Sequence, residues 1–399
     1  MLLLSLVATA SRTAAQSLPA GPLRALDGRL TVSGEIVATA GERDETAFFN
    51  YTDYEHNTLR LMRLGLSGLW RPTHWLAFVG EVRSEDLGEI RPYAAYVRVR
   101  PWRGHAFDIQ AGRIPPSFGA FGRRAYGSGN PVIGYPLAYQ YLTSLRPDAI
   151  PGTANDLLRM RARGWRPSFP IGASTTAPGV PLVSTFRWDT GVQLRWARGP
   201  VEMTAAVTSG TLSNPRVSDD NDGKQISGRV AVTPASGLIL GASAARGAWL
   251  SRDVAPDTFR QDALGADAEY SRGHWLVRAE MVWSRWALPL GLPPSGERSV
   301  SALAAWAEGR YRLTPRIFVA ARADRLGFSR IVGGAGGQAG SSARAAPIPW
   351  DAPVERLEAT AGYYLQRNLV ARLSAQANWR AAGRVRDRKY YAAQLGYWF

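Results

Sequence analysis

The chain contains no cysteine, only four histidines and only two lysines among its 399 residues. The missing cysteine excludes a disulfide-bonded scaffold, a cysteine-based zinc site and a thiol nucleophile. The histidines (His56, His74, His105 and His274) are scattered and leave little for histidine chemistry. No stretch reaches the roughly 18–20 continuous apolar residues that a membrane-spanning helix requires, which excludes a multi-span helical protein.

Positive charge, almost all of it carried by arginine, is in clear excess. The 48 basic residues include only Lys224 and Lys389 as lysines and face 32 acidic residues, so the formal net charge is +16. Hydrophobic residues make up 45% of the chain, a share that argues against disorder. The arginines are spread along the chain and not gathered in a basic arm, so we expect no nucleic-acid partner.

The N-terminus has the pattern of an export signal. Residues 1–10 are apolar, and small residues follow up to Ala15. We therefore expect a signal peptide at 1–15 and a short periplasmic segment at 16–29. The basic residues that normally open such a signal are missing, and a buried N-terminal strand is the alternative interpretation.

Alternation with a period of two dominates the rest of the sequence and predicts strands with one apolar and one polar face. About sixteen such segments occur, each about ten to fifteen residues long: 30–40, 58–71, 74–86, 91–102, 105–113, 185–198, 200–210, 225–234, 238–250, 262–272, 274–286, 299–313, 316–328, 354–366, 368–380 and 389–399. A tilted membrane strand needs ~9–11 residues, whereas strands of soluble proteins average ~5–6. The sequence thus predicts an all-β fold, a transmembrane antiparallel β-barrel over residues 30–399.

The connections support a membrane barrel over a soluble sandwich, because tight turns alternate with longer loops. With an even number of strands, both termini lie at the tight-turn end, which is periplasmic in such barrels. Five tryptophans flank these turns, where an aromatic girdle is expected: Trp70, Trp75, Trp102, Trp196 and Trp275. We therefore expect the bacterial outer membrane as the location, with apolar side chains facing lipid and polar side chains facing the lumen.

One connection is much longer than the others. Residues 114–184 hold 10 of the 26 prolines, and a loop of this length is either functional or disordered. It carries more arginine than acid. A further hairpin around Leu157 to Trp165 would raise the strand number to eighteen.

At this point the chain resembles the bacterial outer-membrane porins, and among them the phosphate-selective porin-like group. The resemblance rests on the C-terminal Tyr397-Trp398-Phe399, on the strand number, on the position of the long loop and on the segment from Ala111 to Gly119. It implies that the loop at 114–184 folds into the lumen. It also implies a homotrimer and recognition of Phe399 by the barrel assembly machinery. Phosphate specificity is not carried over, because that group uses lysines as well as arginines along the pore.

The arginines make anions the expected solutes, since lumen-facing cations concentrate anions electrostatically. The candidate constriction residues are Arg113, Arg123, Arg124, Arg159, Arg161 and Arg163. The candidate lumen-lining residues are Arg98, Arg100, Arg195, Arg372 and Arg380. Inward acids could pair with many of them: Glu81, Glu85, Asp189, Glu202, Asp267, Glu280, Glu308, Asp324 and Glu358.

The function predicted from the sequence is therefore a passive porin for small hydrophilic solutes that favours anions. Its other partners would be outer-membrane lipid and lipopolysaccharide, and we expect no cofactor and no metal. A non-conducting barrel with an adhesive, structural or assembly role is the main alternative, and a barrel enzyme is a weaker one. The stretch 218–223 resembles a calcium loop, but Ser218 stands at its first ligand position and the closing Glu is missing.

Overall fold

The computed structural model describes residues 18–44, 49–50, 57–102, 104–163, 171–172, 179–185, 188–216, 219, 221, 223–255, 258–288, 299–332, 346–383 and 385–399. The predicted signal at 1–15, His56, Ser218 and the side chain of Arg163 lie outside this description. No helix within the described ranges is long and apolar enough to cross a membrane.

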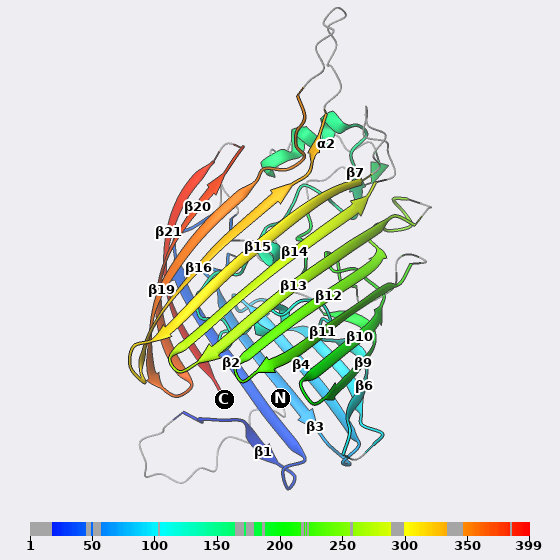
Figure 1. Ribbon diagram of the computed structural model, residues 1–399. Helices are drawn as coiled ribbons and strands as arrows, with labels where there is room; N and C mark the ends of the chain where they lie inside the picture. Colours follow the sequence, from blue (N-terminus) through cyan, green and yellow to red (C-terminus); the bar gives the residue numbers. More distant parts are fainter. Residues whose placement is uncertain are drawn as a thin grey trace, which may run out of the picture.

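Sixteen long antiparallel strands close into a barrel, as the alternation predicts (Figure 1). They are β2 (Leu30–Gly41), β3 (Met62–Trp70), β4 (Leu76–Glu85), β5 (Arg91–Val99), β6 (Ala106–Ile114), β9 (Asp189–Arg198), β10 (Val201–Thr208), β11 (Gln225–Ala235), β12 (Leu238–Ala248), β13 (Arg260–Arg272), β14 (Trp275–Ala287), β15 (Ser299–Arg312), β16 (Ile317–Phe328), β19 (Val354–Gln366), β20 (Leu369–Arg380) and β21 (Asp387–Trp398). The first and last of these strands pair with each other, with Thr39 opposite Gln394, and this pairing closes the barrel.

The remaining elements are short. They are β1 (Leu23–Ala25), β7 (Ala149–Ile150), β8 (Ile171–Gly172), β17 (Arg330–Ile331), β18 (Ile348–Pro349), the helices α1 (Leu137–Gln140) and α2 (Ala154–Met160), and the 3-10 turns η1 (Gly122–Arg124) and η2 (Arg161–Arg163). The suggested hairpin around Leu157 is wrong, because that stretch is helical. Thr153 caps α2 by accepting the Asp156 N–H at 3.2 Å, which favours a helix start there.

The two faces of the wall differ as the alternation predicts. On β20, Leu373 is 67% exposed on the outer face, whereas the neighbouring Arg372 is 3% exposed on the inner face. The same alternation runs through the other long strands, so the outer surface has an apolar band. The inner surface carries the buried polar side chains, together with apolar ones such as Trp306 that pack against the loop. This is the reverse of a soluble barrel and suits a lipid surround.

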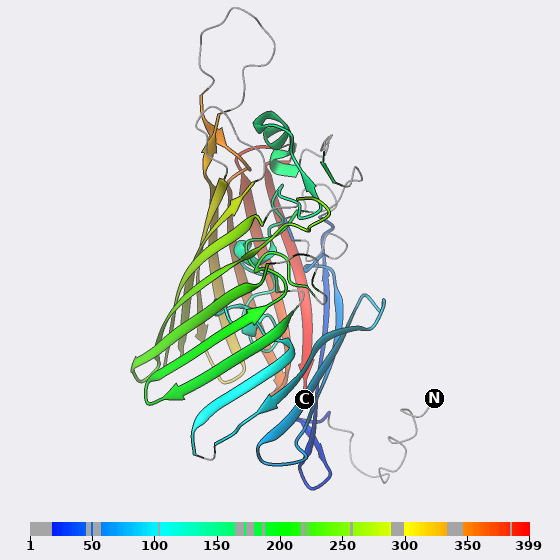
Figure 2. The same ribbon diagram turned by 90° about the vertical axis from the view of Figure 1, so that its right-hand side faces the viewer.

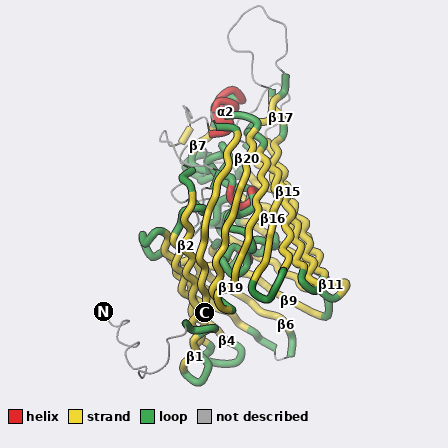
Figure 3. Tube along the Cα trace, turned by 90° about the vertical axis from the view of Figure 1, so that its left-hand side faces the viewer, coloured by secondary structure: helices red, strands yellow, loops and turns green. Residues whose placement is uncertain are grey.

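Both ends of the described chain lie at the end of the barrel where the short turns are (Figure 3). Phe399 and Gly34 exchange two backbone hydrogen bonds, of 3.0 and 3.1 Å, and β1 pairs with the start of β2 just beyond them. The five tryptophans predicted for the girdle are all exposed near these turns. We call this the lower end, following its position in Figure 1.

Candidate functional site: the lumen and its long loop

The first part of the segment between β6 and β9, through α1, lies inside the barrel wall, and α2 lies at its upper end (Figure 2). Two glycines turn the chain inward, Gly112 with φ of +125° and Gly119 with φ of +70°. A Cβ atom at Gly119 would collide with the Tyr139 hydroxyl and the Glu280 carboxylate. The stretch that carries the porin resemblance is therefore where the loop leaves the wall, at positions that need glycine.

Glu280 anchors the loop to the wall. This buried carboxylate on β14 accepts the Ala120 N–H and the Tyr139 hydroxyl, both at 2.8 Å, and the Trp306 indole N–H at 3.2 Å. Ala120 and Tyr139 stand at the two ends of one loop stretch. A single satisfied acid therefore fixes both ends of that stretch to the same point of the wall.

A row of alternating charges crosses five neighbouring strands beneath the loop. Glu269, Arg278, Glu308, Arg322 and Glu358 face one another in register on β13, β14, β15, β16 and β19. The ion pairs measure 2.9 Å for Arg278 with Glu269, 3.3 Å for Arg278 with Glu308 and 2.6 Å for Arg322 with Glu308. Because these pairs are buried and hydrogen-bonded, the row is a built part of the wall.

The charge row also holds the loop backbone. The Glu358 carboxylate accepts the N–H groups of Ile133 and Gly134, at 3.0 and 2.9 Å, and Arg322 donates to the Gly134 carbonyl at 2.8 Å. A loop inside a barrel has no strand partner for its backbone groups. Charged wall side chains supply the hydrogen bonds that this buried backbone requires.

The loop reaches other walls as well. The Tyr126 hydroxyl donates to Glu81 on β4 at 2.9 Å, and Arg372 on β20 donates to the Gly127 carbonyl at 2.6 Å. These contacts join the loop to strands well separated from β14 around the barrel. The loop therefore narrows the lumen.

Asp351, between β18 and β19, ties the loop down near the upper end. Its buried carboxylate accepts the N–H groups of Ser144 at 2.9 Å, Ala162 at 2.8 Å and Ala352 at 2.7 Å. Burial raises the pKa of Asp351, and these three donors act in the opposite direction. One acid thus connects the middle of the loop, η2 and the chain just before β19.

A partly exposed basic group lies on the β9–β10 side of the lumen. Glu202 on β10 lies between Arg123 of the loop, at 3.3 Å, and Arg195 on β9, at 3.0 Å. The side chains of Arg123 and Arg195 are 33% and 42% exposed, so the space beside them is large enough for water. Asp108 on β6 lies opposite Arg195 in the register and pairs with Arg100 at 3.7 Å. Glu202 is thus the one acid that Arg123 and Arg195 share as an ion-pair partner, and it leaves one of their two positive charges unbalanced.

Arg98 adds to this surplus, whereas Arg124 balances the charge row, which has three acids and two arginines. Arg98 on β5 faces inward, and among the described residues its guanidinium group has no ion pair. Arg124 pairs with Glu269 at 2.5 Å, but Glu269 is shared with Arg278 of the charge row. Burial lowers the pKa values of Arg123 and Arg124, yet an arginine remains protonated at neutral pH. We call Arg98, Arg123, Arg124 and Arg195 the lumen basic cluster.

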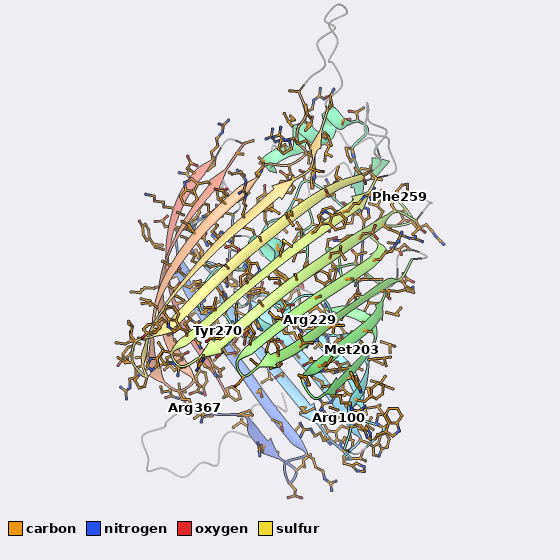
Figure 4. The ribbon with its side chains drawn as sticks, viewed as in Figure 1. Arg100, Met203, Arg229, Phe259, Tyr270 and Arg367 are labelled. Atoms are coloured by element: carbon orange, nitrogen blue, oxygen red, sulfur yellow. The ribbon has the colours of Figure 1, made fainter. Side chains whose placement is uncertain are left out.

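The other predicted lumen arginines have different surroundings. Arg100 lies at the lower end, half exposed and 3.7 Å from Asp108 (Figure 4). Arg372 is buried against the loop carbonyl described above. Arg380 is buried and donates to the carbonyls of Ala382 and Val385, at 3.2 and 2.8 Å, near the upper end. Arg372 and Arg380 therefore have structural partners in the protein.

Several predicted constriction arginines lie elsewhere. Arg113 occupies the outward phase of β6, opposite Ala95, and donates to the carbonyls of Pro92 and Trp188. Arg159 is on α2, 71% exposed and 3.7 Å from Asp156. Arg161 and Arg163 belong to η2, which follows α2 at the upper end (Figure 1). The upper-end position of α2 and η2 places Arg159 and Arg161 away from the lumen basic cluster.

The predicted lists of constriction and lumen-lining residues leave out several inward arginines that share the alternation of their strands. They are Arg63, Arg83, Arg229, Arg278, Arg310, Arg322 and Arg356. Their phase was visible in the sequence, so the same rule that selected Arg195 would have found them. The nine acids predicted to face inward all lie in the inward phase, and several pair with these arginines.

No family profile matches the sequence, and no curated protein matches it. Solved structures do match its fold. An anion-selective porin from Comamonas acidovorans aligns with a TM-score of 0.55 at 10% identity, covering 93% of this chain and 99% of that one. The outer-membrane channel DcaP of Acinetobacter baumannii gives 0.53 at 9% identity, covering 95% and 100%. OmpF of Salmonella typhi, in complex with daunomycin, gives 0.53 at 12% identity, covering 93% and 97%.

These likenesses show a shared fold, the sixteen-stranded porin-type barrel. A closed barrel with an apolar outer face satisfies all its backbone groups within lipid, and such barrels occupy the bacterial outer membrane. The chain is therefore an outer-membrane barrel.

Proposed function

We propose that the protein is a porin that lets small hydrophilic solutes diffuse passively across the outer membrane and that it favours anions. The observation that carries the proposal is the single carboxylate of Glu202 between Arg123 and Arg195, in a lumen region open to water. Arg98, which faces the same region, adds a further positive charge.

The physical basis is electrostatic focusing. A lumen of low-dielectric walls lined by charges of one sign raises the local concentration of the opposite ion. Rings of arginine select anions by the same effect. The sixteen-strand porin fold supports a channel, and the charge surplus supports the preference for anions.

We propose a channel and not an enzyme. The described histidines, His74, His105 and His274, stand at the lower turns, and no cluster of three or more metal-ligating side chains occurs in the described part of the chain. The inward face instead carries paired charges that hold a loop. The 218–223 stretch, which resembles a calcium-binding loop, is only partly described, and its Asp219 pairs with Lys224.

Phosphate is one small anion that the lumen basic cluster would attract. The resemblance to phosphate-selective porins rests on the 111–119 segment, and this segment places the loop without touching the cluster. We therefore propose no special selection of phosphate over other small anions of equal charge.

The remaining partners are proposals as well. Phe399 pairs with Gly34 at the closure of the barrel, which is consistent with recognition of this residue by the assembly machinery. The apolar outer band suits lipid and lipopolysaccharide. Outward alanines on neighbouring strands, including Ala305, Ala323 and Ala359, would let a second copy approach closely, as a homotrimer requires.

Planar-bilayer recording tests the proposal. The refolded protein should give discrete conductance steps, with a reversal potential in a salt gradient that indicates anion preference. Replacing Arg123 and Arg195 together by Gln should move the reversal potential toward zero. Steps with cation preference would overturn the anion proposal, and correctly inserted protein without steps would overturn the channel itself.

One observation favours the alternative, a barrel that does not conduct. The loop contacts β4 through Tyr126 and β13 through Arg124, so it bridges distant parts of the wall. In that case the bilayer recordings would show insertion without conductance, and a structural or adhesive role would replace transport.

A further inference from the structure

The short turns that join barrel strands at the lower end carry charge of one sign. Six of the seven descending strands that lead into a short turn end in arginine. Arg198, Arg272 and Arg312 are the last strand residues, and Arg71, Arg100 and Arg367 directly follow their strands. The short turns themselves contain no aspartate or glutamate. All six arginines are exposed, and Figure 4 shows Arg100 and Arg367 at this end.

Three of these arginines face lipid or lie beside it. Arg198 and Arg272 continue the outward phase of β9 and β13, after the exposed Trp196 and Tyr270, and Arg367 follows the exposed Leu365. Within the described residues none of the three has an ion pair. Exposed aromatic residues mark the membrane–water interface, so the guanidinium groups lie at the depth of the lipid headgroups.

The upper end shows the contrast. There the outward arginines have partners: Arg246 pairs with Asp262 at 3.3 Å, Arg325 pairs with Glu355 at 3.6 Å, and Arg285 donates to Ser299 at 2.9 Å. Arg260 on β13 and Lys389 on β21 are exceptions at the upper end, since they are exposed and have no ion pair within the described residues. The unpaired arginines of the lower end differ from them by lying beside the aromatic girdle. Three unpaired cations beside an aromatic girdle lie at the depth where lipid phosphate groups are the nearest anions.

We propose that Arg198, Arg272 and Arg367 bind the phosphate headgroups of anionic phospholipids in the periplasmic leaflet. The guanidinium fork matches phosphate oxygens in two parallel hydrogen bonds. The binding fixes the depth of the barrel in the membrane and gives it a shell of anionic lipid. It does not depend on conduction through the lumen.

The test compares two triple variants of the full chain, reconstituted in vesicles of phosphatidylcholine with an increasing share of brominated phosphatidylglycerol. One carries Arg198→Gln, Arg272→Gln and Arg367→Gln. The control carries Arg246→Gln, Arg285→Gln and Arg325→Gln, which removes the same charge from the upper end. Quenching of tryptophan fluorescence reports phosphatidylglycerol at the barrel wall. The heat-modifiable change in electrophoretic mobility confirms that each barrel is folded.

The wild type and the control should show enrichment of phosphatidylglycerol that weakens in 0.5 M salt. The lower-end variant should lose it, by about fivefold for each arginine, because a cation near an anionic surface contributes ~1 kcal/mol. Enrichment that survives in the lower-end variant would overturn the proposal, as would an equal loss in the control. Arginine-dependent sedimentation with purified peptidoglycan, without lipid enrichment, would assign the ring to the cell wall and also overturn it.

Discussion

The inward arginines of this protein have two roles, a structural one and an electrostatic one, and the partners of each arginine distinguish them. Arg322 and Arg356 are fully buried and donate to carbonyls of the loop and to neighbouring side chains. Arg123 and Arg195 share one acid and keep exposed surface in the lumen. The first kind replaces the strand partners that a buried loop lacks. The second kind provides the charge that solutes would meet in the proposed channel.

Glu202 determines the net charge around the exposed arginines, Arg123 and Arg195. Replacing Glu202 by Gln keeps its size and leaves Arg123 and Arg195 without their shared negative charge. A unit charge about 8 Å from an ion in water is worth roughly 0.5 kcal/mol, with opposite sign for anion and cation. We therefore expect the ratio of anion to cation permeability to rise by roughly fivefold in dilute salt, measured by reversal potential.

Asp262→Asn is the matched control, because Asp262 lies on the outer face of β13 and pairs with Arg246. It removes the same charge at a point that solutes do not meet. An unchanged ratio in the Glu202 variant, or an equal rise in the control, would mean that Arg123 and Arg195 do not govern selectivity.

At the scale of elements, the strands were predictable and the loop was not. Each strand is defined locally, by alternation along its own length, and the predicted ranges agree with the observed ones to within a few residues. The path of the loop depends on contacts such as that of Glu358 with Ile133, which are 225 residues apart in the chain. No local pattern encodes such a contact. Arg159 was predicted to line the constriction for this reason, whereas the structure places its helix, α2, at the upper end.

The path of the loop from β6 into the lumen depends on Gly119, so Gly119→Ala should weaken the attachment of the loop to the wall. The added Cβ would meet the Tyr139 hydroxyl and the Glu280 carboxylate in a backbone conformation that alanine adopts at a cost. We expect a loss of ~1–3 kcal/mol in the free energy of unfolding in urea, together with noisier conductance.

Gly273→Ala provides the comparison for that variant. Gly273 also has a positive φ, of +58°, but a Cβ there would meet nothing within 4 Å. The Gly273→Ala variant should therefore lose less stability and show no increase in current noise. Equal effects of the two substitutions would show that backbone strain alone, and not the anchor at Glu280, explains the result.

At the scale of the whole molecule, the charges are ordered along the barrel axis. The upper end mixes both signs in ion pairs, the lumen holds a positive surplus beside paired charges, and the short turns are purely basic. An anion that crosses from the lower end therefore meets positive charge at the mouth and again at the lumen basic cluster.

If selectivity arises from this summed field, it must weaken with salt. The screening length falls from about 10 Å at 0.1 M to about 3 Å at 1 M, which is shorter than the distance from the wall to an ion in mid-lumen. We expect the ratio of anion to cation permeability of the wild type to fall toward unity over this range, in reversal potentials measured at a constant concentration ratio. A ratio that stays constant would require solutes to touch the arginines directly. The Arg123 and Arg195 double variant would then lose conductance for anions at every salt concentration, and not only its selectivity in dilute salt.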